Sequence, residues 1–250
     1  EILASVNADH WGYLMGGLDS GGSRMSSILK FLFTTEADST LAASLNTANA
    51  QSVGVQSAAK GFAMGGYTGS PSGLIEDINF ATDSSDALGA SLSTPRYSGA
   101  GASSSLKGYI GGGNNDSSNQ SSFEALTFSG ESIGAVSGTL DAARQRLAAC
   151  HSTLKAYFAG GSTGSLSTAI DDLVFATEAS AALGATLDVA RSGLSGVYGS
   201  LMGYFAGGFV SGPAISAEID DLDFSSEASA DLGTNLSAAR RAPFSLSNPQ

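Results

Sequence analysis

The sequence predicts an all-β fold built from repeated units, and three observations carry this prediction. A Gly-Gly pair recurs five times along the 250 residues, at steps of 49, 47, 48 and 47 residues. An aromatic residue stands three positions before each pair. The apolar segments around the pairs are short and bounded by Gly, Ser and Pro, which is typical of strands. A repeat of about 48 residues is typical of a β-propeller, in which each repeat forms one four-stranded blade.

Two further positions recur at regular distances within each repeat. The Gly-Gly pairs are Gly16-Gly17, Gly65-Gly66, Gly112-Gly113, Gly160-Gly161 and Gly207-Gly208. A second aromatic follows each pair by 15 to 17 residues, and a leucine lies 12 residues beyond that aromatic in every repeat. The leucines are Leu45, Leu92, Leu140, Leu187 and Leu236. Because only the interval between the pair and the aromatic changes in length, we expect it to hold a surface loop between the second and third strands.

The innermost strand of each blade is predicted from segments with small side chains, which suit strands that crowd a narrow centre. These segments are "LASVN" (3–7), "VGVQS" (53–57), "GAGAS" (99–103), "LAACH" (147–151) and "SGVYG" (195–199). The third strand alternates, with Asp171, Leu173 and Phe175 on one face. The segment "ALGATL" (182–187) predicts a fourth strand. The alternative is an Ala-rich helix over 177–191, which Gly184 disfavours.

The repeats divide a single domain into units of similar length. Their boundaries are residues 1–48, 49–95, 96–143, 144–190 and 191–240. Residues 241–250 are in phase with the start of the chain and predict either an extra inner strand or a tail. Two architectures stay open: a ring closed with five blades, which we favour, or part of a longer propeller.

Charge and cysteine content exclude several classes of function. The net charge is −12, and the lysines and arginines form no basic cluster, so binding to nucleic acid or to an anionic membrane surface is not expected. Cys150 is the only cysteine, so no intramolecular disulfide can form. No apolar run approaches the roughly 18 residues that cross a bilayer, and no membrane insertion is expected.

With these positions in place, the unit resembles the kelch repeat. The likeness lies in the aromatic before the Gly-Gly pair, the third strand with acidic and aromatic members, and a Leu-x-x-x-Arg sequence that ends four of the repeats. The arginines are Arg96, Arg144, Arg191 and Arg240. The first repeat departs from the pattern with Asn49, and the tryptophan expected after the third strand is missing. The only tryptophan, Trp11, is predicted to lie in a turn.

The resemblance implies a propeller fold but no particular activity, because kelch propellers include binding modules, structural proteins and a few enzymes. Gly/Ser-rich, Trp-poor arrays of this kind are similar to those in proteins of bacteriophage particles and other surface appendages. The resemblance therefore implies a location on an extracellular surface or a virion.

Carboxylates in the third strands are expected to hold neighbouring blades together. Adjacent acids such as Asp171 and Asp172 point to opposite faces of a strand, so they do not share a site. We expect one acid in each blade, Asp171 and Asp220 among them, to accept hydrogen bonds from backbone amides or from the repeat arginine of a nearby blade.

No catalytic residue, metal site or cofactor is expected. His10 and His151 are the only histidines, whereas a zinc or copper site usually needs two or three held close together. Cys150 adjoins His151, but neighbours on a strand point in opposite directions. The polar loop "GGGNNDSSNQSS" (111–122) lacks the central glycine and distal glutamate of an EF-hand, which favours a solvated loop.

The predicted binding surface lies at the tips of the loops between the second and third strands. Its candidate residues are Asp19, Arg24, Tyr67, Asn114, Asn115, Asp116 and Phe209. Exposed aromatics beside Asn, Asp and Ser suit contacts with a glycan or a protein.

Together these features favour a non-catalytic binding or structural propeller, displayed on a particle or cell surface. Its expected partners are a glycan or protein ligand and neighbouring subunits of a larger particle. The alternative is a carbohydrate-active enzyme with carboxylates at the mouth of the central channel, which needs two acids about 5–10 Å apart. A third hypothesis is an assembly subunit with no ligand beyond its own copies or neighbouring shell proteins.

Overall fold

The computed structural model describes residues 4–8, 11–212 and 214–241. Every regular element in this part of the chain is a β-strand, which confirms the all-β prediction. Accordingly, none of the described segments is a helix that could span a membrane. The strands form five antiparallel sheets, four of them with four strands and one with three.

Each sheet is made from one continuous stretch of chain. The first sheet contains β1 (Ala4–Ala8), β2 (Trp11–Met15), β3 (Met25–Leu32) and β4 (Ala37–Asn49). The second contains β5 (Val53–Gln56), β6 (Lys60–Met64) and β7 (Ile75–Asn79). The third contains β8 (Ala100–Ser103), β9 (Lys107–Gly111), β10 (Ser122–Thr127) and β11 (Ser132–Thr139). The fourth contains β12 (Ala148–His151), β13 (Lys155–Ala159), β14 (Ala169–Val174) and β15 (Ser180–Thr186). The fifth contains β16 (Ser195–Tyr198), β17 (Met202–Ala206), β18 (Ile219–Asp223) and β19 (Ser229–Asp231).

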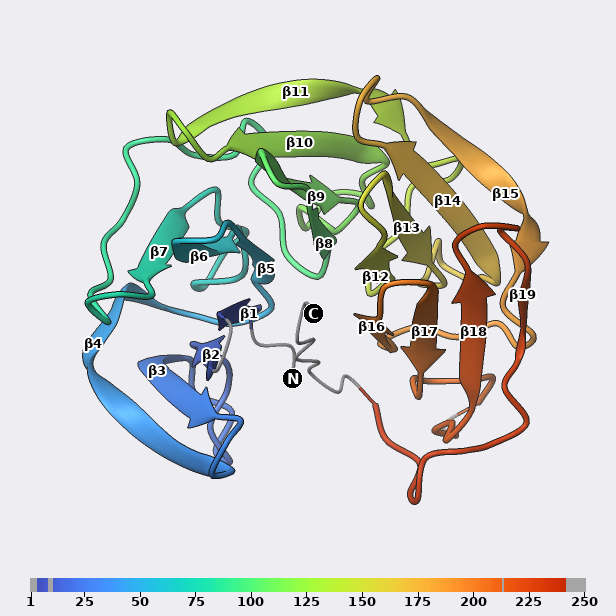
Figure 1. Ribbon diagram of the computed structural model, residues 1–250, viewed down its shortest axis with the longest axis horizontal. Coiled ribbons are helices and arrows are strands. Elements are labelled where there is room, and N and C mark those ends of the chain that lie inside the picture. The colour runs from blue at the N-terminus through green and yellow to red at the C-terminus, as the bar shows by residue number, and fades with distance from the viewer. Residues whose placement is uncertain (1–3, 9–10, 213, 242–250) are drawn as a thin grey trace.

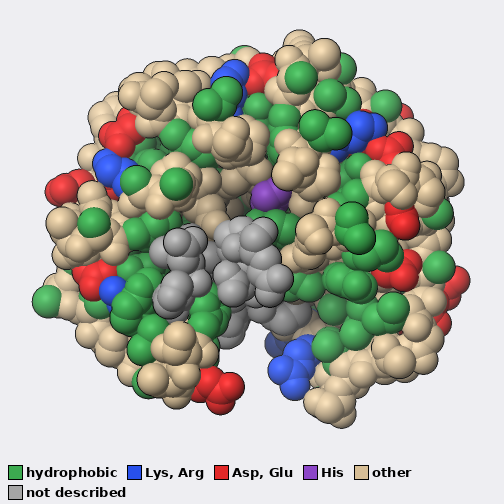
Figure 2. Space-filling view, in the orientation of Figure 1, with side chains coloured by type: hydrophobic (Ala, Val, Ile, Leu, Met, Phe, Trp, Pro, Cys, Tyr) green, Lys and Arg blue, Asp and Glu red, His purple; other side chains and the backbone are tan. Residues whose placement is uncertain are grey.

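The sheets are arranged around a common centre, with the first strand of each innermost and the last strand outermost (Figure 1). The innermost strands contact one another in chain order, from β1 through β5, β8 and β12 to β16. Contact of that extent between β16 and β1 is absent among the described strands. Figure 2 shows a notch at the rim of the molecule between the first and fifth sheets. The described residues therefore form an arc of five sheets and not the closed ring that the sequence favoured.

The strand predictions agree closely with the structure in the inner and outer positions. Four of the five innermost strands, β5, β8, β12 and β16, lie within the predicted segments, and β1 overlaps its segment. The segment predicted as a fourth strand at 182–187 overlaps β15, so the alternative of an Ala-rich helix is wrong. Residues 242–250, for which an extra inner strand or a tail was predicted, lie outside the described residues.

Two predictions need correction. The second sheet lacks a regular fourth strand, although its chain still runs beside β7, where Leu88 N donates to Ile75 O. Asp86 O accepts from Asp77 N at 2.8 Å and Glu76 forms an isolated bridge with Ala87, so the segment stays bonded to β7 without a continuous ladder. Trp11 does not lie in a turn but begins β2, with the Lys30 ammonium 3.9 Å from the centre of its ring.

The hydrophobic core lies between the sheets. Four buried clusters occur in the described residues, one at each contact between consecutive sheets. In each contact, the aromatic before the Gly-Gly pair stacks on the second aromatic of the next repeat. The stacked pairs are Tyr13–Phe80, Phe62–Phe128, Tyr109–Phe175 and Tyr157–Phe224, with ring centroids 5.3–5.6 Å apart. Each sheet thus depends on its neighbour to bury its aromatic residues.

Candidate functional site

One edge of the arc is formed by two kinds of connection that pair with each other. The loop between the second and third strands of a sheet forms an isolated β-bridge with the segment that enters the same sheet from the preceding sheet. The bridged pairs are Ala50–Tyr67, Tyr97–Asn114, Gln145–Ser162 and Ser192–Phe209. Backbone N–H···O bonds of 2.7–3.2 Å run in both directions in every pair. We call the surface made by these eight residues and the adjoining loops the connection surface.

The Gly-Gly pairs fix the base of the connection surface. The N–H of the second glycine donates to the carbonyl oxygen at the repeat arginine position, as Gly113 N does to Arg144 O at 3.0 Å. Gly113 has φ of 99°, and a Cβ there would lie 2.8 Å from Tyr97 O. Only glycine satisfies both the positive φ and the close approach. The residue that follows each pair therefore starts from the same backbone position in every repeat.

Side chains on this constant backbone differ from repeat to repeat. The residue after the Gly-Gly pair is Leu18, Tyr67, Asn114, Ser162 or Phe209. Its bridge partner in the adjoining segment is Ala50, Tyr97, Gln145 or Ser192. The buried positions, in contrast, keep their aromatic, leucine and arginine residues. Ala50 and Ser192 are buried, but the other variable positions are partly exposed, which makes them the best candidates for contacts with a ligand.

Four of these side chains, from the first three repeats, make a continuous line. The Arg24 guanidinium lies 5.7 Å from the ring centroid of Tyr67. Tyr67 and Tyr97 meet edge to face with centroids 5.2 Å apart. The Tyr97 hydroxyl donates to Asp116 Oδ1 at 3.1 Å. The line thus joins a cation, two amphipathic rings and a carboxylate at the surface.

The environment of Tyr97 keeps its hydroxyl protonated. Its pKa is raised by partial burial first and by the hydrogen bond to Asp116 second. Neutral tyrosine is a hydrogen-bond donor and acceptor beside an apolar ring, so it can contact both C–H and hydroxyl groups of a ligand. Sequence reasoning missed Tyr97, although it directly follows the repeat arginine Arg96 at a position that varies between repeats.

The predicted asparagines shape the loop beside this line. Asn114 Oδ1 accepts from Asp116 N at 2.7 Å, and Asn114 Nδ2 donates to Asn119 Oδ1 at 2.8 Å. Asn115 Oδ1 accepts from the amides of Ser117 and Ser118. These bonds position Asp116 for its contact with the Tyr97 hydroxyl.

The other two predicted residues do not join the line. Asp19 Oδ1 accepts from the backbone amides of Gly21 and Ser23, so this carboxylate stabilises its own loop. Phe209 belongs to the fifth repeat, and the Arg241 guanidinium lies 4.9 Å from its ring centroid. The structure therefore brings Arg24, Tyr67, Asn114, Asn115 and Asp116 to one region and leaves Asp19 and Phe209 outside it.

The predicted structural residues lie between the sheets. Three arginines, each at the end of one repeat, reach a carboxylate in the third strand of the next sheet. The pairs are Arg96–Glu124, Arg144–Asp171 and Arg191–Asp220. All six side chains are buried. Arg240 occupies the same backbone position, since Gly208 N donates to its carbonyl oxygen, but its side chain is exposed and has no carboxylate partner among the described residues.

Three of the remaining third-strand acids are engaged as well, whereas the Asp221 carboxylate has no side-chain partner among the described residues. Asp77 and Asp172 lie 2.6 and 2.7 Å from Lys60 and Lys155. Glu76 accepts from Asn46 N, while its Oε2 atom is buried without a hydrogen-bond partner, and burial raises its pKa. These carboxylates hold the sheets in place and do not face a common cavity.

Neither metal ligands nor a nucleophile–base pair gather in the described part of the chain. No group of three or more His, Cys, Asp or Glu side chains suited to a metal occurs there. His10 lies outside the described residues. Cys150 is buried, and burial raises the pKa of its thiol. His151 packs against Tyr198, with ring centroids 3.9 Å apart, and burial lowers its pKa to about 4.

The opposite edge of the arc carries exposed leucines that sequence reasoning did not single out. Leu106, Leu154 and Leu201 lie at the same position in the turns between the first and second strands of the last three sheets. Each is 72–73% exposed. Their shared position is visible in the sequence as "SSLK", "STLK" and "GSLM".

No protein-family model matches the chain, and no curated protein matches it in sequence. The case for its function therefore rests on the connection surface and on the contacts between sheets.

Proposed function

We propose that the chain is a kelch-type β-propeller assembly that works as a non-catalytic binding scaffold, with the connection surface as its ligand-binding face. The single observation that supports this most is the change of side chain on an unchanged backbone at Tyr67, Asn114, Ser162 and Phe209. A scaffold with variable residues at fixed positions is how repeat folds present a binding surface.

The propeller assignment is supported by the arrangement of the sheets. Consecutive repeats form antiparallel sheets with the first strand innermost, and the innermost strands lie side by side in chain order. Buried arginine–carboxylate pairs at the repeat boundaries suit the kelch-like sequence pattern. In this assignment each sheet is a blade, and the connection surface is one face of the propeller.

The ligand we propose is a glycan or a protein that meets the line from Arg24 to Asp116. Tyrosine rings present flat apolar faces, and the neighbouring asparagine, aspartate and arginine side chains supply polar groups. This combination suits a sugar ring, which has C–H faces and hydroxyl edges, and it equally suits a polar patch on a protein. Display on a particle or cell surface is proposed from the resemblance to surface arrays.

An enzyme acting on carbohydrate is not proposed, because the acids it would need are engaged elsewhere. Glycosidases place two free carboxyl groups about 5–10 Å apart across a cavity. Here Glu124, Asp171 and Asp220 are buried against arginines, and Asp77 and Asp172 bind lysines.

A comparison of two double variants tests the proposed binding face. Fluorescently labelled chain is applied to an array of printed glycans and to a peptide-display library. Tyr67→Ala/Tyr97→Ala should lower the affinity for any ligand found by at least about tenfold, since truncated aromatic anchors typically cost more than 1 kcal/mol. The matched control is Gln145→Ala/Ser162→Ala, which alters a bridged pair of the same geometry in a neighbouring repeat.

The two arms of the experiment separate the ligand classes. Glycan binding that is lost only in the tyrosine variant supports a glycan-binding face, and the same result with displayed peptides supports a protein-binding face. Wild-type affinity in the tyrosine variant contradicts the proposed site.

A further inference from the structure

The four contacts between consecutive sheets follow one rule of side-chain pairing. The earlier sheet contributes an aromatic in its second strand and a leucine, and three of the four contacts add an arginine, for which the first contact has Asn49. All of these residues are buried by the later sheet. For the contact between the fourth and fifth sheets these are Tyr157, Leu187 and Arg191, each no more than 1% exposed. The later sheet contributes a buried carboxylate, Asp220, which receives the arginine.

A second ionic link lies farther from the centre. In the later sheet, the turn after the third strand holds an acid at positive φ. This acid accepts a hydrogen bond from a side chain in the second strand of the earlier sheet. Lys60, Lys107 and Lys155 lie 2.6–2.7 Å from Glu131, Glu178 and Glu227. At the first contact, the Tyr13 hydroxyl donates to Asp83 at 2.8 Å. Each contact between sheets therefore has an acidic partner at two positions.

The outward face of the fifth sheet has the earlier-sheet residues without a later sheet to cover them. Tyr204 and Leu236 are half-buried, and Arg240 is exposed, whereas their counterparts in the other repeats are buried. Arg240 Nε makes one long contact to Ala238 O, 3.4 Å away, and no carboxylate lies within salt-bridge distance in the described chain. Besides its apolar residues, this face carries Arg240, which has no carboxylate partner among the described residues, and Asp221, which lies opposite Tyr204 in the β17–β18 pairing. Met202 stands where the fourth sheet has Lys155, so Asp221 lacks the lysine that binds Asp172.

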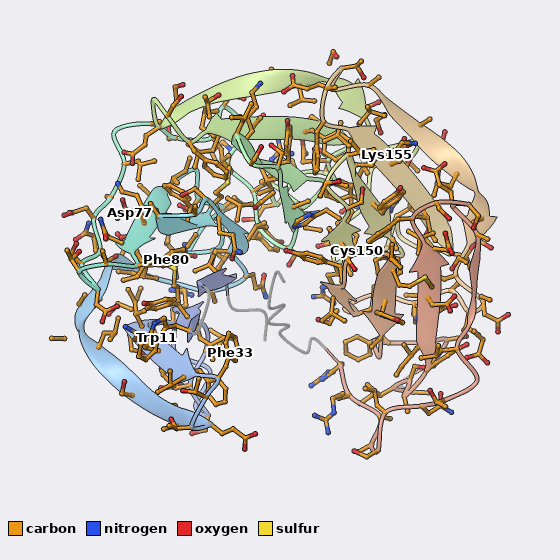
Figure 3. All side chains as sticks on the ribbon, in the orientation of Figure 1. Trp11, Phe33, Asp77, Phe80, Cys150 and Lys155 are labelled. Atoms are coloured by element: carbon orange, nitrogen blue, oxygen red, sulfur yellow. The ribbon has the colours of Figure 1, made fainter. Side chains whose placement is uncertain are left out.

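Among its described residues, the facing side of the first sheet has no acid at the position that would receive Arg240. Leu29 stands where the later repeats have Glu76, Glu124, Asp171 and Asp220. Leu14, Leu29 and Phe31 are half-buried, although their counterparts in the other sheets are almost fully buried. Phe33 is half-buried too, and Figure 3 places it on the part of the first sheet that borders the notch. Glu36, in the turn that follows, is exposed and makes none of the ionic links of its counterparts.

Direct contact between the fifth and first sheets would allow the aromatic stacking but not the arginine–carboxylate pair of the other contacts. Tyr204 could stack on Phe33 and donate to Glu36, but Arg240 would be buried against Leu29. Burying a guanidinium without an acceptor is strongly unfavourable. The same mismatch arises whether the first sheet belongs to the same chain or to a second copy, because both present Leu29.

We propose that the notch is a docking site for a sixth four-stranded sheet of the same repeat type, with an Asp or Glu in its third strand that pairs with Arg240. The same rule specifies its other residues. A neutral hydrogen-bond acceptor in its outer turn accepts from Tyr204, since Asp221 already lies beside that ring. An aromatic after its third strand stacks on Tyr204, and a Lys or Tyr in its second strand donates to Glu36. An apolar residue replaces arginine at its end, opposite Leu29. The occupant is thus a sheet with a defined charge pattern, and this edge is separate from the connection surface.

Insertion of a suitable repeat into the full chain tests the proposal. A copy of residues 145–191 is inserted between Arg240 and Arg241, with the copy of Arg191 changed to leucine to face Leu29. This copy supplies the counterpart of Asp171 for Arg240 and the counterpart of Lys155 for Glu36. Its copy of Glu178 is changed to glutamine, because it would lie beside Asp221 without a lysine at position 202. We expect Tm to rise by about 10 °C, since several kcal/mol of buried contact is added to a chain of this size. Arg240→Leu should remove at least about half of that rise in the extended chain and shift Tm by less than about 2 °C in the 250-residue chain.

A matched extension isolates the charge pair. The same insertion with its copy of Asp171 changed to leucine should lose the dependence on Arg240. A rise in Tm that is equal with and without Arg240, or no rise in a folded extended chain, overturns the proposal.

Cross-linking in the 250-residue chain tests whether the notch is open, independently of the insertion. Phe33→Cys/Tyr204→Cys is treated with a short bismaleimide, while the buried Cys150 serves as the internal unreactive thiol. Slow cross-linking, in a protein that sediments as a monomer, supports an open notch. Efficient cross-linking within one chain shows closure onto the first sheet, and cross-linking between chains shows a second copy in the notch. Either of these two results overturns the proposal.

Discussion

The guanidinium of Arg96, in the segment between the second and third sheets, lies 2.9 Å from the carboxylate of Glu124 in β10 of the third sheet. The Arg96 backbone is bonded to the second repeat, since Gly66 N donates to its carbonyl oxygen at 2.8 Å. Its side chain donates to Glu124 and to Ser122 O of the third repeat. With exposed fractions of 0% and 3%, this ion pair is withdrawn from water and ties one sheet to the next.

Breaking the Arg96–Glu124 pair should lower the stability of the folded protein. Glu124→Leu leaves a buried guanidinium without its counter-charge and removes the acceptor of Ser93 N. We expect the free energy of unfolding to fall by about 3–5 kcal/mol, the range for loss of one member of a buried pair. Urea unfolding followed by circular dichroism measures the change.

The repeat itself supplies the control for that variant. Arg240→Leu removes an arginine from the equivalent position at which no acid is present, and should change stability by less than about 0.5 kcal/mol. Arg96→Leu/Glu124→Leu should lose less than the sum of the two single variants, because it leaves no unpaired charge. A loss in Glu124→Leu as small as that in Arg240→Leu would show that the pair does not stabilise the contact.

Much of the fold could be predicted because the features that define it recur at fixed spacing. The Gly-Gly pair, the two aromatics, the leucine and the arginine all serve the contact between sheets, and each has one physical role repeated along the chain. The irregular fourth strand of the second sheet could not be predicted, because Leu88 and Leu92 have the same spacing as Leu183 and Leu187 in the repeat that forms a regular strand.

The surface features were harder to predict for a physical reason. Tyr97 contributes to the line because its backbone is bridged to Asn114, a contact that no periodic pattern in the sequence marks. Leu29 is visible in the sequence as a departure from the acidic residues of the other repeats. Its role could not be predicted, because only the structure shows that the acid at this position receives an arginine across the contact between sheets.

The first glycine of each pair should tolerate no side chain. Gly112 has φ of 66°, and a Cβ there would lie 2.6 Å from Arg144 O. We expect Gly112→Ala to lower the free energy of unfolding by at least about 3 kcal/mol, because the left-handed strain and the backbone clash add. The matched control is Gly212→Ala, at φ of 79° with open space around it, which should cost only about 1–2 kcal/mol. Thermal or urea unfolding compares the two, and equal losses would mean that close approach to Arg144 is unimportant.

The single thiol should report opening of the contact between the fourth and fifth sheets. Cys150 is 1% exposed and packs where a Cβ on Gly203 would come within 2.4 Å of its sulfur. Because burial raises its pKa, the thiolate is scarce in the folded protein. We expect labelling by a disulfide reagent to be slow in native buffer and to accelerate with urea in parallel with unfolding. Rapid labelling in native buffer, at the rate of a free thiol, would contradict the burial of Cys150.

A buried histidine should make stability fall at mildly acidic pH. The His151 ring packs against Tyr198, and its Nδ1 lies 3.1 Å from Ser152 O. Burial lowers its pKa from 6.5 to about 4, so the unfolded chain takes up the proton first as the pH falls. This contribution to stability is complete above about pH 6.5 and is lost as the pH falls toward about 4, to a total of up to about 3 kcal/mol.

The variant His151→Phe isolates that contribution, because it keeps an aromatic ring against Tyr198 and removes the titrating nitrogen atoms. Urea unfolding of both proteins at several pH values between about 7.5 and about 4.5 gives the difference in unfolding free energy. All other ionisable groups are shared by the two proteins, so their effects cancel in this difference. We expect the unfolding free energy of the variant to rise steadily relative to that of the wild type as the pH falls below about 6.5. Only the wild type must keep a buried imidazole neutral. A difference that stays constant over this range would mean that His151 titrates alike in the folded and unfolded chains, and that its ring is hydrated in the folded protein.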